Sequence, residues 1–238
     1  MKDLARQVIW VTGASGALGR AVCERLHGLG AQVIVSGRNV DTLPISRSRV
    51  QRLSLDVTDT QAVEAAAQAI VLKHGRIDGL VTCTTTPRFG DFLTLQDKDW
   101  SEVLDTKLMG SIRAARAVIP TMISQKGGSI VFISGRGGTV PPPRHLPGAC
   151  ANSALNLLAQ GLATEYGEHG IRVNALAPGP IKSPRLELMK AGVANARSAL
   201  GHAGTPEDVA HAVTFLLGPG AMHVTGICLP VDGGRAKS

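Results

Sequence analysis

The stretch Thr12-Gly13-Ala14-Ser15-Gly16-Ala17-Leu18-Gly19 decides the fold of this chain. It follows a β-branched run at Val8–Thr12 and leads into a helical pattern at Leu18–Leu29. Glycines at this spacing permit a tight turn, close approach of the backbone to a ligand, and close packing of the helix on the strand. A helix start also offers backbone N–H groups and a positive dipole end. We therefore expect a loop that binds the pyrophosphate of a dinucleotide.

Strand and helix patterns alternate through the rest of the chain. Further strands are expected at Gln32–Ser36, Val50–Leu55, Ile77–Thr82, Ser129–Ser134, Arg172–Ala177 and Ile227–Val231. Helices are expected at Thr60–His74, Asp99–Ser124, Ala149–Glu168 and Pro206–Leu217, the last capped by Thr205. This alternation predicts parallel strands with right-handed crossovers. We expect an α/β fold with a doubly wound (Rossmann-type), parallel seven-stranded sheet, in a single domain spanning residues 1–238.

Two segments interrupt the alternation. Gly135–Pro147 contains three consecutive prolines, Pro141 to Pro143, and is expected to form no regular structure. Pro178–Gly204 is long and irregular, which is typical of a lid or a substrate-binding loop.

The composition restricts the classes of function. The net charge is +7, but the basic residues are spread along the chain and aromatic residues make up only 3%. A solvated basic surface is favoured over nucleic-acid binding. The four cysteines are scattered, and no histidine or cysteine cluster has metal-ligand spacing, so no metal site is expected. No stretch has the length of a membrane span, and we expect a soluble, cytoplasmic protein that does not bind membranes.

Several segments together resemble the short-chain dehydrogenase/reductase family, and in particular its 3-oxoacyl-reductase-like members. They are Thr12–Gly19, Leu55-Asp56-Val57-Thr58, Gly170-Ile171-Arg172-Val173-Asn174-Ala175, Ala177-Pro178-Gly179-Pro180, Thr205-Pro206-Glu207-Asp208 and Pro230-Val231-Asp232-Gly233-Gly234. One departure lies in the loop itself, where Ala17 stands at the family's middle glycine position. The resemblance covers nearly the whole chain.

The resemblance implies a set of cofactor-binding residues. They are Gly13, Ser15, Gly16, Ala17, Leu18, Gly19, Arg38, Asp56, Val57, Thr82, Pro178, Ile181 and Ser183. Members that prefer NAD(H) usually carry an acid at the end of the second strand, where this chain has Gly37-Arg38-Asn39. Because an arginine can pair with a 2′-phosphate, NADP(H) is favoured over NAD(H). The alternative is that Arg38 is a solvated loop residue and that the cofactor binds weakly or not at all.

The family's catalytic residues are missing from the expected positions. The resemblance places the tyrosine position at Gly148, the lysine position at Asn152, the serine position at Gly135 and the asparagine position at Lys107. The only tyrosine in the chain is Tyr166, and no lysine lies between Lys126 and Lys182. A Tyr-x-x-x-Lys pair is therefore impossible. The family uses that pair because a phenol is a poor acid–base catalyst at neutral pH unless a cation lowers its pKa.

Four nearby residues are candidate substitutes in catalysis, namely Ser134, His145, Lys107 and Cys150. For each one the plainer interpretation is favoured. Ser134 is then a strand-end hydroxyl, His145 a solvated loop residue, Lys107 a surface charge and Cys150 a helix-packing residue.

Three functions remain open. The first is a catalytically impaired, dinucleotide-binding subunit with a regulatory or structural role, and the second is an NADP(H)-dependent oxidoreductase acting on a small molecule with a non-standard proton donor. The third is an NADP(H) sensor with a responsive lid. The resemblance implies a homodimer or homotetramer through the two long helices, or a hetero-oligomer with an active paralogue.

Overall fold

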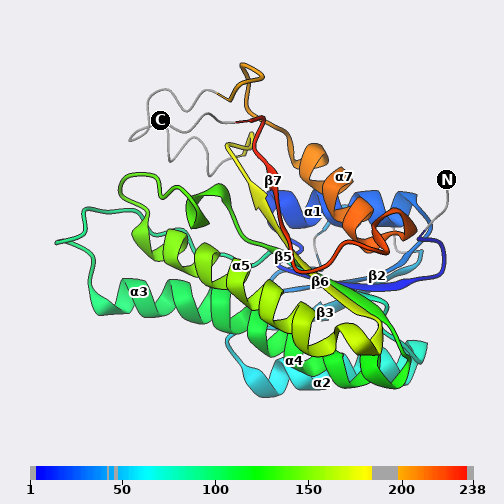
Figure 1. The fold of residues 1–238 in the computed structure, drawn as a ribbon. Helices are drawn as coiled ribbons and strands as arrows, with labels where there is room; N and C mark the ends of the chain where they lie inside the picture. Colours follow the sequence, from blue (N-terminus) through cyan, green and yellow to red (C-terminus); the bar gives the residue numbers. More distant parts are fainter. Residues whose placement is uncertain (1–3, 42, 46–47, 184–197, 235–238) are drawn as a thin grey trace.

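The central sheet has the expected topology. The computed structural model describes residues 4–41, 43–45, 48–183 and 198–234, and within them one parallel sheet runs in the order β3-β2-β1-β4-β5-β6-β7 (Figure 1). Its strands are β1 (Val8–Thr12), β2 (Gln32–Gly37), β3 (Val50–Ser54), β4 (Gly79–Thr82), β5 (Gly128–Ile133), β6 (Ile171–Pro178) and β7 (Cys228–Val231). The strand order changes direction between β1 and β4. Ligands of such sheets bind at this point, beyond the carboxyl ends of the strands.

Helices cover both faces of the sheet (Figure 1). One face carries α1 (Ala17–Gly28) and α7 (Pro206–Leu217), and the other carries α2 (Thr60–His74), α4 (Gly110–Ser124) and α5 (Leu146–Tyr166). Along β1, Ile9 and Val11 join the core under α1 and α7, while Val8 and Trp10 join the core on the opposite face. This alternation is the two-residue period of a strand that is buried on both sides. The doubly wound single-domain prediction is confirmed.

The end signals in the sequence account for the bounds of two helices. Thr205 accepts a hydrogen bond from the backbone N–H of Asp208, whose carboxylate accepts one from the backbone N–H of Thr205, so α7 begins with a capping box. Helix α2 begins after Asp59, which caps the backbone N–H of Ala62, and ends at Gly75 in the left-handed conformation. Both helices have the predicted limits.

The segment predicted as one helix at Asp99–Ser124 is divided. It consists of α3 (Asp97–Val103), the π-helical segment η1 (Leu104–Met109) and α4. A π-turn widens the helix locally, and such turns occur frequently at functional sites. It places Lys107 at the carboxyl edge of the sheet.

The prediction that Gly135–Pro147 contains no regular structure was wrong at both ends. A 3₁₀ turn, η2, covers Arg136–Gly138, and α5 begins at Leu146 with Pro147 in its first turn, where a missing N–H is harmless.

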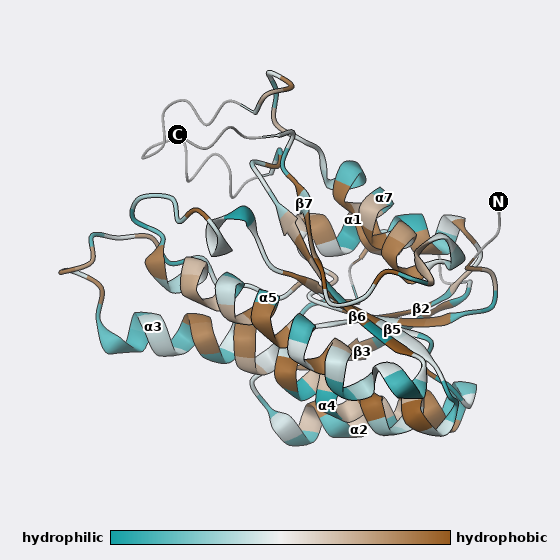
Figure 2. Cartoon of the chain, viewed as in Figure 1, coloured by the Kyte–Doolittle hydropathy of each residue, from teal (hydrophilic) through white to brown (hydrophobic). Residues whose placement is uncertain are grey.

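Bands of hydrophobic and hydrophilic residues alternate along α4 and α5 (Figure 2). None of the helices in the described part of the chain combines the length and the apolarity that crossing a bilayer requires.

Candidate functional site

The loop after β1 has the backbone geometry that its glycines predict. Gly13 has φ +69°, and a Cβ there would lie 2.7 Å from the backbone carbon of Cys83, so only glycine allows the loops after β1 and β4 to pack together. A Cβ on Gly19 would lie 2.3 Å from the carbonyl oxygen of Gly13, so α1 needs that glycine to pack on the loop. By contrast, the face formed by Ser15, Gly16 and Ala17 is exposed at the start of α1. It presents the helix N-terminus to solvent.

The carboxyl ends of β2 and β3 bring Arg38 and Asp56 close enough to interact electrostatically. Asp56 Oδ1 accepts hydrogen bonds from the backbone N–H and the hydroxyl of Thr58, both at 2.9 Å. The backbone N–H of Thr58 is the main cause that holds the pKa of Asp56 below its usual value, with smaller effects from that hydroxyl, Arg38 and Arg113. Arg38 itself is exposed. The carboxylate of Asp56 and the exposed guanidinium of Arg38 therefore lie at the carboxyl edge of the sheet, where the adenosine of a cofactor is expected.

Val57 is buried beside them. Its carbonyl oxygen accepts a hydrogen bond from Arg113 Nη1 at 3.2 Å, and Arg113 also forms an ion pair with Asp105 at 2.7 Å. Arg113 therefore connects the loop after β3 to η1. No sequence signal distinguished this arginine from the others.

The segments expected around the nicotinamide are only partly described. Thr82 is buried and its hydroxyl accepts a hydrogen bond from Ser111 at 2.9 Å. Pro178 ends β6, Ile181 forms an isolated parallel bridge with Gly204, and the Ser183 hydroxyl donates to the carbonyl oxygen of Ile181. The two ends of the predicted lid at Pro178–Gly204 are thus paired. Its residues 184–197 lie outside the described residues.

His145 occupies the space that a side chain at position 148 would need. A Cβ on Gly148 would lie 2.2 Å from both Cε1 and Nε2 of the His145 ring. His145 is 4% exposed, its ring centroid is 4.7 Å from that of Phe89, and Nδ1 lies 3.2 Å from the carbonyl oxygen of Arg88. Since a carbonyl oxygen only accepts, Nδ1 carries the proton in this contact. The expectation of a solvated His145 was wrong.

Lys107 is also buried, so its assignment as a surface charge was wrong. It is 5% exposed, and Nζ donates to the carbonyl oxygens of Ile133 and Ser134 at 3.3 and 3.1 Å. Asn152 stands on α5 with 5% exposure, and its Oδ1 has no hydrogen-bond partner among the residues that the structure describes. A Cβ on Gly135 would lie 2.7 Å from Asn152 Nδ2. The lysine and asparagine expected from the family are therefore both represented near the end of β5, at exchanged positions.

The other two candidate substitutes lie differently. The Ser134 hydroxyl donates to the carbonyl oxygen of Leu176 at 3.2 Å, as a strand-end hydroxyl would. Cys150 is exposed on α5 and points away from the face shared by Gly148 and Asn152, because residues two positions apart lie on opposite sides of a helix. It is not the packing residue that was expected. Tyr166 ends the same helix, about 27 Å along the axis from Gly148.

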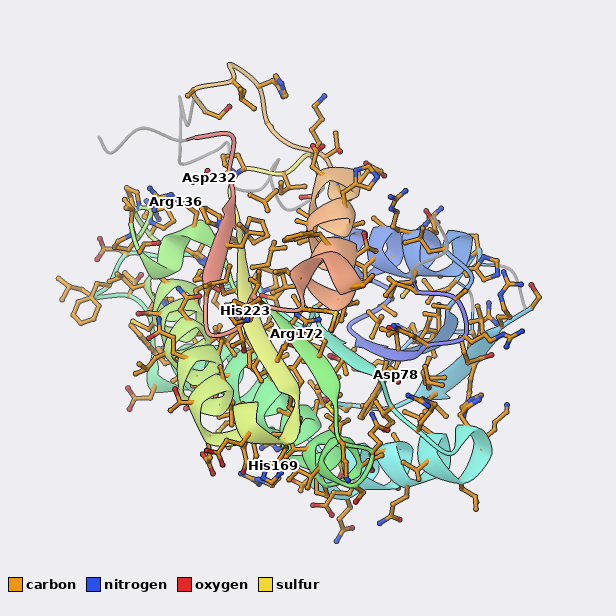
Figure 3. The ribbon with its side chains drawn as sticks, turned by 45° about the vertical axis from the view of Figure 1, so that its right-hand side comes forward. Asp78, Arg136, His169, Arg172, His223 and Asp232 are labelled. Atoms are coloured by element: carbon orange, nitrogen blue, oxygen red, sulfur yellow. The ribbon has the colours of Figure 1, made fainter. Side chains whose placement is uncertain are left out.

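Arg136 and Asp232 join the segments that follow β5 and β7 (Figure 3). Arg136 Nε lies 2.8 Å from Asp232 Oδ2, and both side chains are largely shielded from solvent. A Cβ on Gly179 would lie 2.7 Å from Asp232 Cα, so the backbone after β6 packs against the same residue. The ion pair holds the segments that follow β5 and β7 together at the carboxyl edge of the sheet. In the sequence, Asp232 is distinguished only as part of a segment that resembles the family.

The residues present fit a dinucleotide. The exposed start of α1 can accept a pyrophosphate, and Arg38 and Asp56 flank the expected adenosine position. The buried Oδ1 of Asn152 finds no donor within the described part of the chain, and a ribose hydroxyl could supply one. Among the described residues, no group of three or more histidine, cysteine or acidic side chains is arranged to hold a metal ion.

Comparisons with known proteins agree with this geometry. A family model described as Enoyl-(Acyl carrier protein) reductase matches residues 13–236. The short-chain reductase protein NovJ of Streptomyces niveus is 35% identical, with 96% of this chain and 93% of that protein covered. The 3-oxoacyl-[acyl-carrier-protein] reductase FabG of Thermotoga maritima is 32% identical, with 97% and 98% covered. The solved structure of Thermoplasma acidophilum aldohexose dehydrogenase superposes with a TM-score of 0.90 at 28% identity, with 98% and 95% covered. The chain belongs to the short-chain dehydrogenase/reductase family.

Proposed function

We propose that the protein binds NADP(H), in preference to NAD(H), at the carboxyl edge of the sheet. Family membership supports binding of a nicotinamide dinucleotide, which when bound would supply hydride-transfer chemistry. The preference is supported by Arg38, which is exposed after β2 where an NAD(H)-binding site usually presents an acid. Gly13, Ser15, Gly16, Ala17, Leu18 and Gly19 would hold the pyrophosphate through the loop and the start of α1. Thr82, Pro178, Ile181 and Ser183 would lie around the nicotinamide.

The tyrosine-dependent reaction of the family is lost in this proposal, and the protein acts as a regulatory or structural subunit. One observation carries it: the ring of His145 fills the space in which a side chain at position 148 would begin. The only tyrosine, Tyr166, lies about 27 Å away along α5 and cannot replace the missing phenol. The binding scaffold is kept while the proton donor is absent. Such a protein is a pseudoenzyme.

Calorimetric titration together with a turnover assay tests this function. We expect NADPH to bind about tenfold more tightly than NADH, and no oxidation of NADPH with a panel of ketones and aldehydes above the level of a loop variant. The loop variant is Gly16→Val, because among the described residues a Cβ at Gly16 meets only the Gly13 carbonyl oxygen, at 3.5 Å. The side chain should therefore obstruct a ligand without disturbing the fold. NADPH oxidation that Gly16→Val abolishes would refute the loss of activity.

A second candidate is an NADP(H)-dependent oxidoreductase that uses His145 as its proton donor. It is favoured by the same ring, because the contact of Nδ1 with the Arg88 carbonyl oxygen fixes its orientation and directs Nε2 toward the vacated tyrosine position. In reduction of a ketone, the protonated ring would give its Nε2 proton to the oxygen of the substrate as the carbon receives hydride. If so, His145→Ala and Lys107→Ala each lower the rate about tenfold or more. Unchanged rates in both variants would remove this candidate.

Assembly and location are proposals as well. A homodimer or homotetramer through α4 and α5 is supported by Leu157, which is 70% exposed on α5. A hetero-oligomer with an active paralogue is the alternative, and a cytoplasmic location remains proposed. Light scattering of the wild type and of Leu157→Glu tests the homo-oligomer, since a buried carboxylate would dissociate it. A single mass equal to the monomer in both would refute it.

A further inference from the structure

The turn that follows β5 carries a single charged side chain, that of Arg136. The run Gly135-Arg136-Gly137-Gly138 contains no other side chain, and its backbone packs closely on α5. A Cβ on Gly138, for example, would lie 2.8 Å from the backbone nitrogen of Ser153. The glycines let the turn approach the helix, and the one side chain of the run extends to the end of β7, where Asp232 lies.

The guanidinium of Arg136 therefore lies at the carboxyl ends of three neighbouring strands, β5, β6 and β7 (Figure 3). Asp232 directly follows β7, and a Cβ on Gly179 would lie 2.7 Å from Asp232 Cα. Gly179 in turn follows Pro178, with which the segment proposed to lie around the nicotinamide begins. The ion pair is thus a direct neighbour of that segment.

Asp232 balances the charge of Arg136 without satisfying its hydrogen bonds. Oδ2 of Asp232 lies 2.8 Å from Nε, but off the direction of the N–H bond, and the buried Nε has no hydrogen-bond partner among the described residues. Nη1 and Nη2 likewise donate to no group in the described part of the chain. A guanidinium has five N–H donors, and a shielded polar group without an acceptor is uncommon in folded proteins. The arrangement calls for an acceptor from outside the chain.

A carboxylate is the acceptor that this guanidinium fits best. Two adjacent N–H groups of an arginine match the two oxygens of a planar carboxylate. A phosphate carries more negative charge and would be repelled more strongly by the nearby carboxylate of Asp232. The side chain of Arg136 keeps 17% of its surface exposed, so a small anion can reach it from the solvent.

We propose that Arg136 binds the carboxylate of a small organic acid beside the segment assigned to the nicotinamide, and that Asp232 holds the guanidinium in place for it. The inference goes beyond the proposed binding of NADP(H) and does not depend on it, because η2 and the end of β7 position both residues through contacts within the protein. The ligand site would make the protein responsive to an acid as well as to a dinucleotide.

A ligand-observed NMR titration of the full-length protein tests the inference. The probes are two stable oxo acids, pyruvate and levulinate, together with their methyl esters, which keep the ketone and lose the charge. We expect the wild type to bind at least one of the acids about tenfold or more tightly than its ester, because the ester cannot form a charge-assisted hydrogen bond. The titration is made without cofactor and repeated with NADPH present.

Arg136→Leu should remove the preference for the acid over the ester. If that variant does not fold, because it leaves Asp232 unpaired, the double variant Arg136→Leu, Asp232→Asn is used, which keeps no charge at the site. A merely structural role of the ion pair would weaken acid and ester by the same factor. Arg25→Leu is the matched control, since it removes the same charge from an exposed position on α1 and should keep the wild-type preference.

Equal affinities of the wild type for acid and ester, or no binding of either, would overturn the inference. A preference that persists in a folded Arg136 variant would do the same. Inorganic phosphate is the third probe, and tighter binding of phosphate than of both acids would refute the assignment to a carboxylate. Failure of NADPH to bind in a separate titration would instead refute the proposed function and leave this inference standing.

Discussion

The imidazole ring of His145 and the missing side chain of Gly148 are complementary in space. A Cβ on Gly148 would lie 2.2 Å from Cε1 and Nε2 of His145, closer than nonbonded atoms can approach. The ring is held on its other side by the carbonyl oxygen of Arg88 and by Phe89. A side chain at position 148 therefore requires His145 to leave its place, and the two positions are coupled.

This coupling predicts that Gly148→Ala destabilises the protein. Overpacking a buried position costs about 1–3 kcal/mol, which outweighs the gain in helix propensity from alanine. We expect the double variant His145→Ala, Gly148→Ala to lose less than the sum of the two single variants, by about 1 kcal/mol. Chemical denaturation measures all three.

Gly161→Ala on the same helix is the control. A Cβ there would meet no atom of the described residues within 4 Å, so alanine should stabilise the protein by about 0.5–1 kcal/mol. If Gly148→Ala behaved like Gly161→Ala, the ring of His145 could not occupy the space assigned to it.

Local signals in the sequence were sufficient for the frame of the fold. The glycines after β1, the cap Thr205, and the alternation of strands and helices each depend on a few neighbouring residues. The π-turn of η1 was not predictable, because the apolar residues continue through Asp99–Ser124 with no break that marks a wider turn.

The interior of the site could not be predicted for a different reason. A lone histidine after three prolines is typical of a solvated loop, and a lysine on a helix is typical of a surface. His145 is buried because Gly148 leaves a space that it can fill, and Lys107 because η1 directs it to the end of β5. The burial of both side chains depends on tertiary contacts, which leave no local signal in the sequence.

Arg38 is expected to determine the preference for NADP(H), which carries a 2′-phosphate, over NAD(H), which does not. A charge-assisted hydrogen bond to a phosphate contributes about 1.5–3 kcal/mol, so Arg38→Gln should weaken NADPH binding about tenfold or more and leave NADH binding nearly unchanged. Calorimetry with both ligands measures this. Arg20→Gln, on the exposed face of α1, should change neither affinity. Equal weakening of NADPH and NADH by Arg38→Gln would show that Arg38 does not contact the 2′-phosphate.

Asp56 should make the stability of the protein depend on pH in the acid range. The backbone N–H of Thr58 is the largest of several causes that lower the pKa of Asp56 in the folded protein. A lowered folded pKa stabilises the protein fully above the unfolded value of about 3.9, and this stabilisation is lost as the pH falls through the folded pKa. The difference in unfolding free energy between wild type and Asp56→Asn should therefore shrink as the pH falls below about 4.

Urea denaturation at several pH values measures that difference. A difference that is constant across the acid range would mean that the charge of Asp56 is not what Thr58 stabilises.

Replacing Asn152 should raise the stability of the ligand-free protein and lower its affinity for the cofactor. Its Oδ1 is buried and has no hydrogen-bond partner in residues 4–41, 43–45, 48–183 and 198–234. A buried acceptor without a partner costs a folded protein about 1–3 kcal/mol. Asn152→Leu keeps the branching at Cγ and the number of side-chain heavy atoms and removes the polar oxygen, so the ligand-free protein should become more stable, by about 1 kcal/mol. If a ribose hydroxyl is the missing donor, the same variant should bind NADPH more weakly, by about fivefold or more.

Thermal unfolding with and without NADPH measures both effects of the Asn152→Leu substitution, because a bound ligand adds more stability the more tightly it binds. A variant that is more stable and binds NADPH as well as the wild type would show that the orphan oxygen faces no part of the ligand.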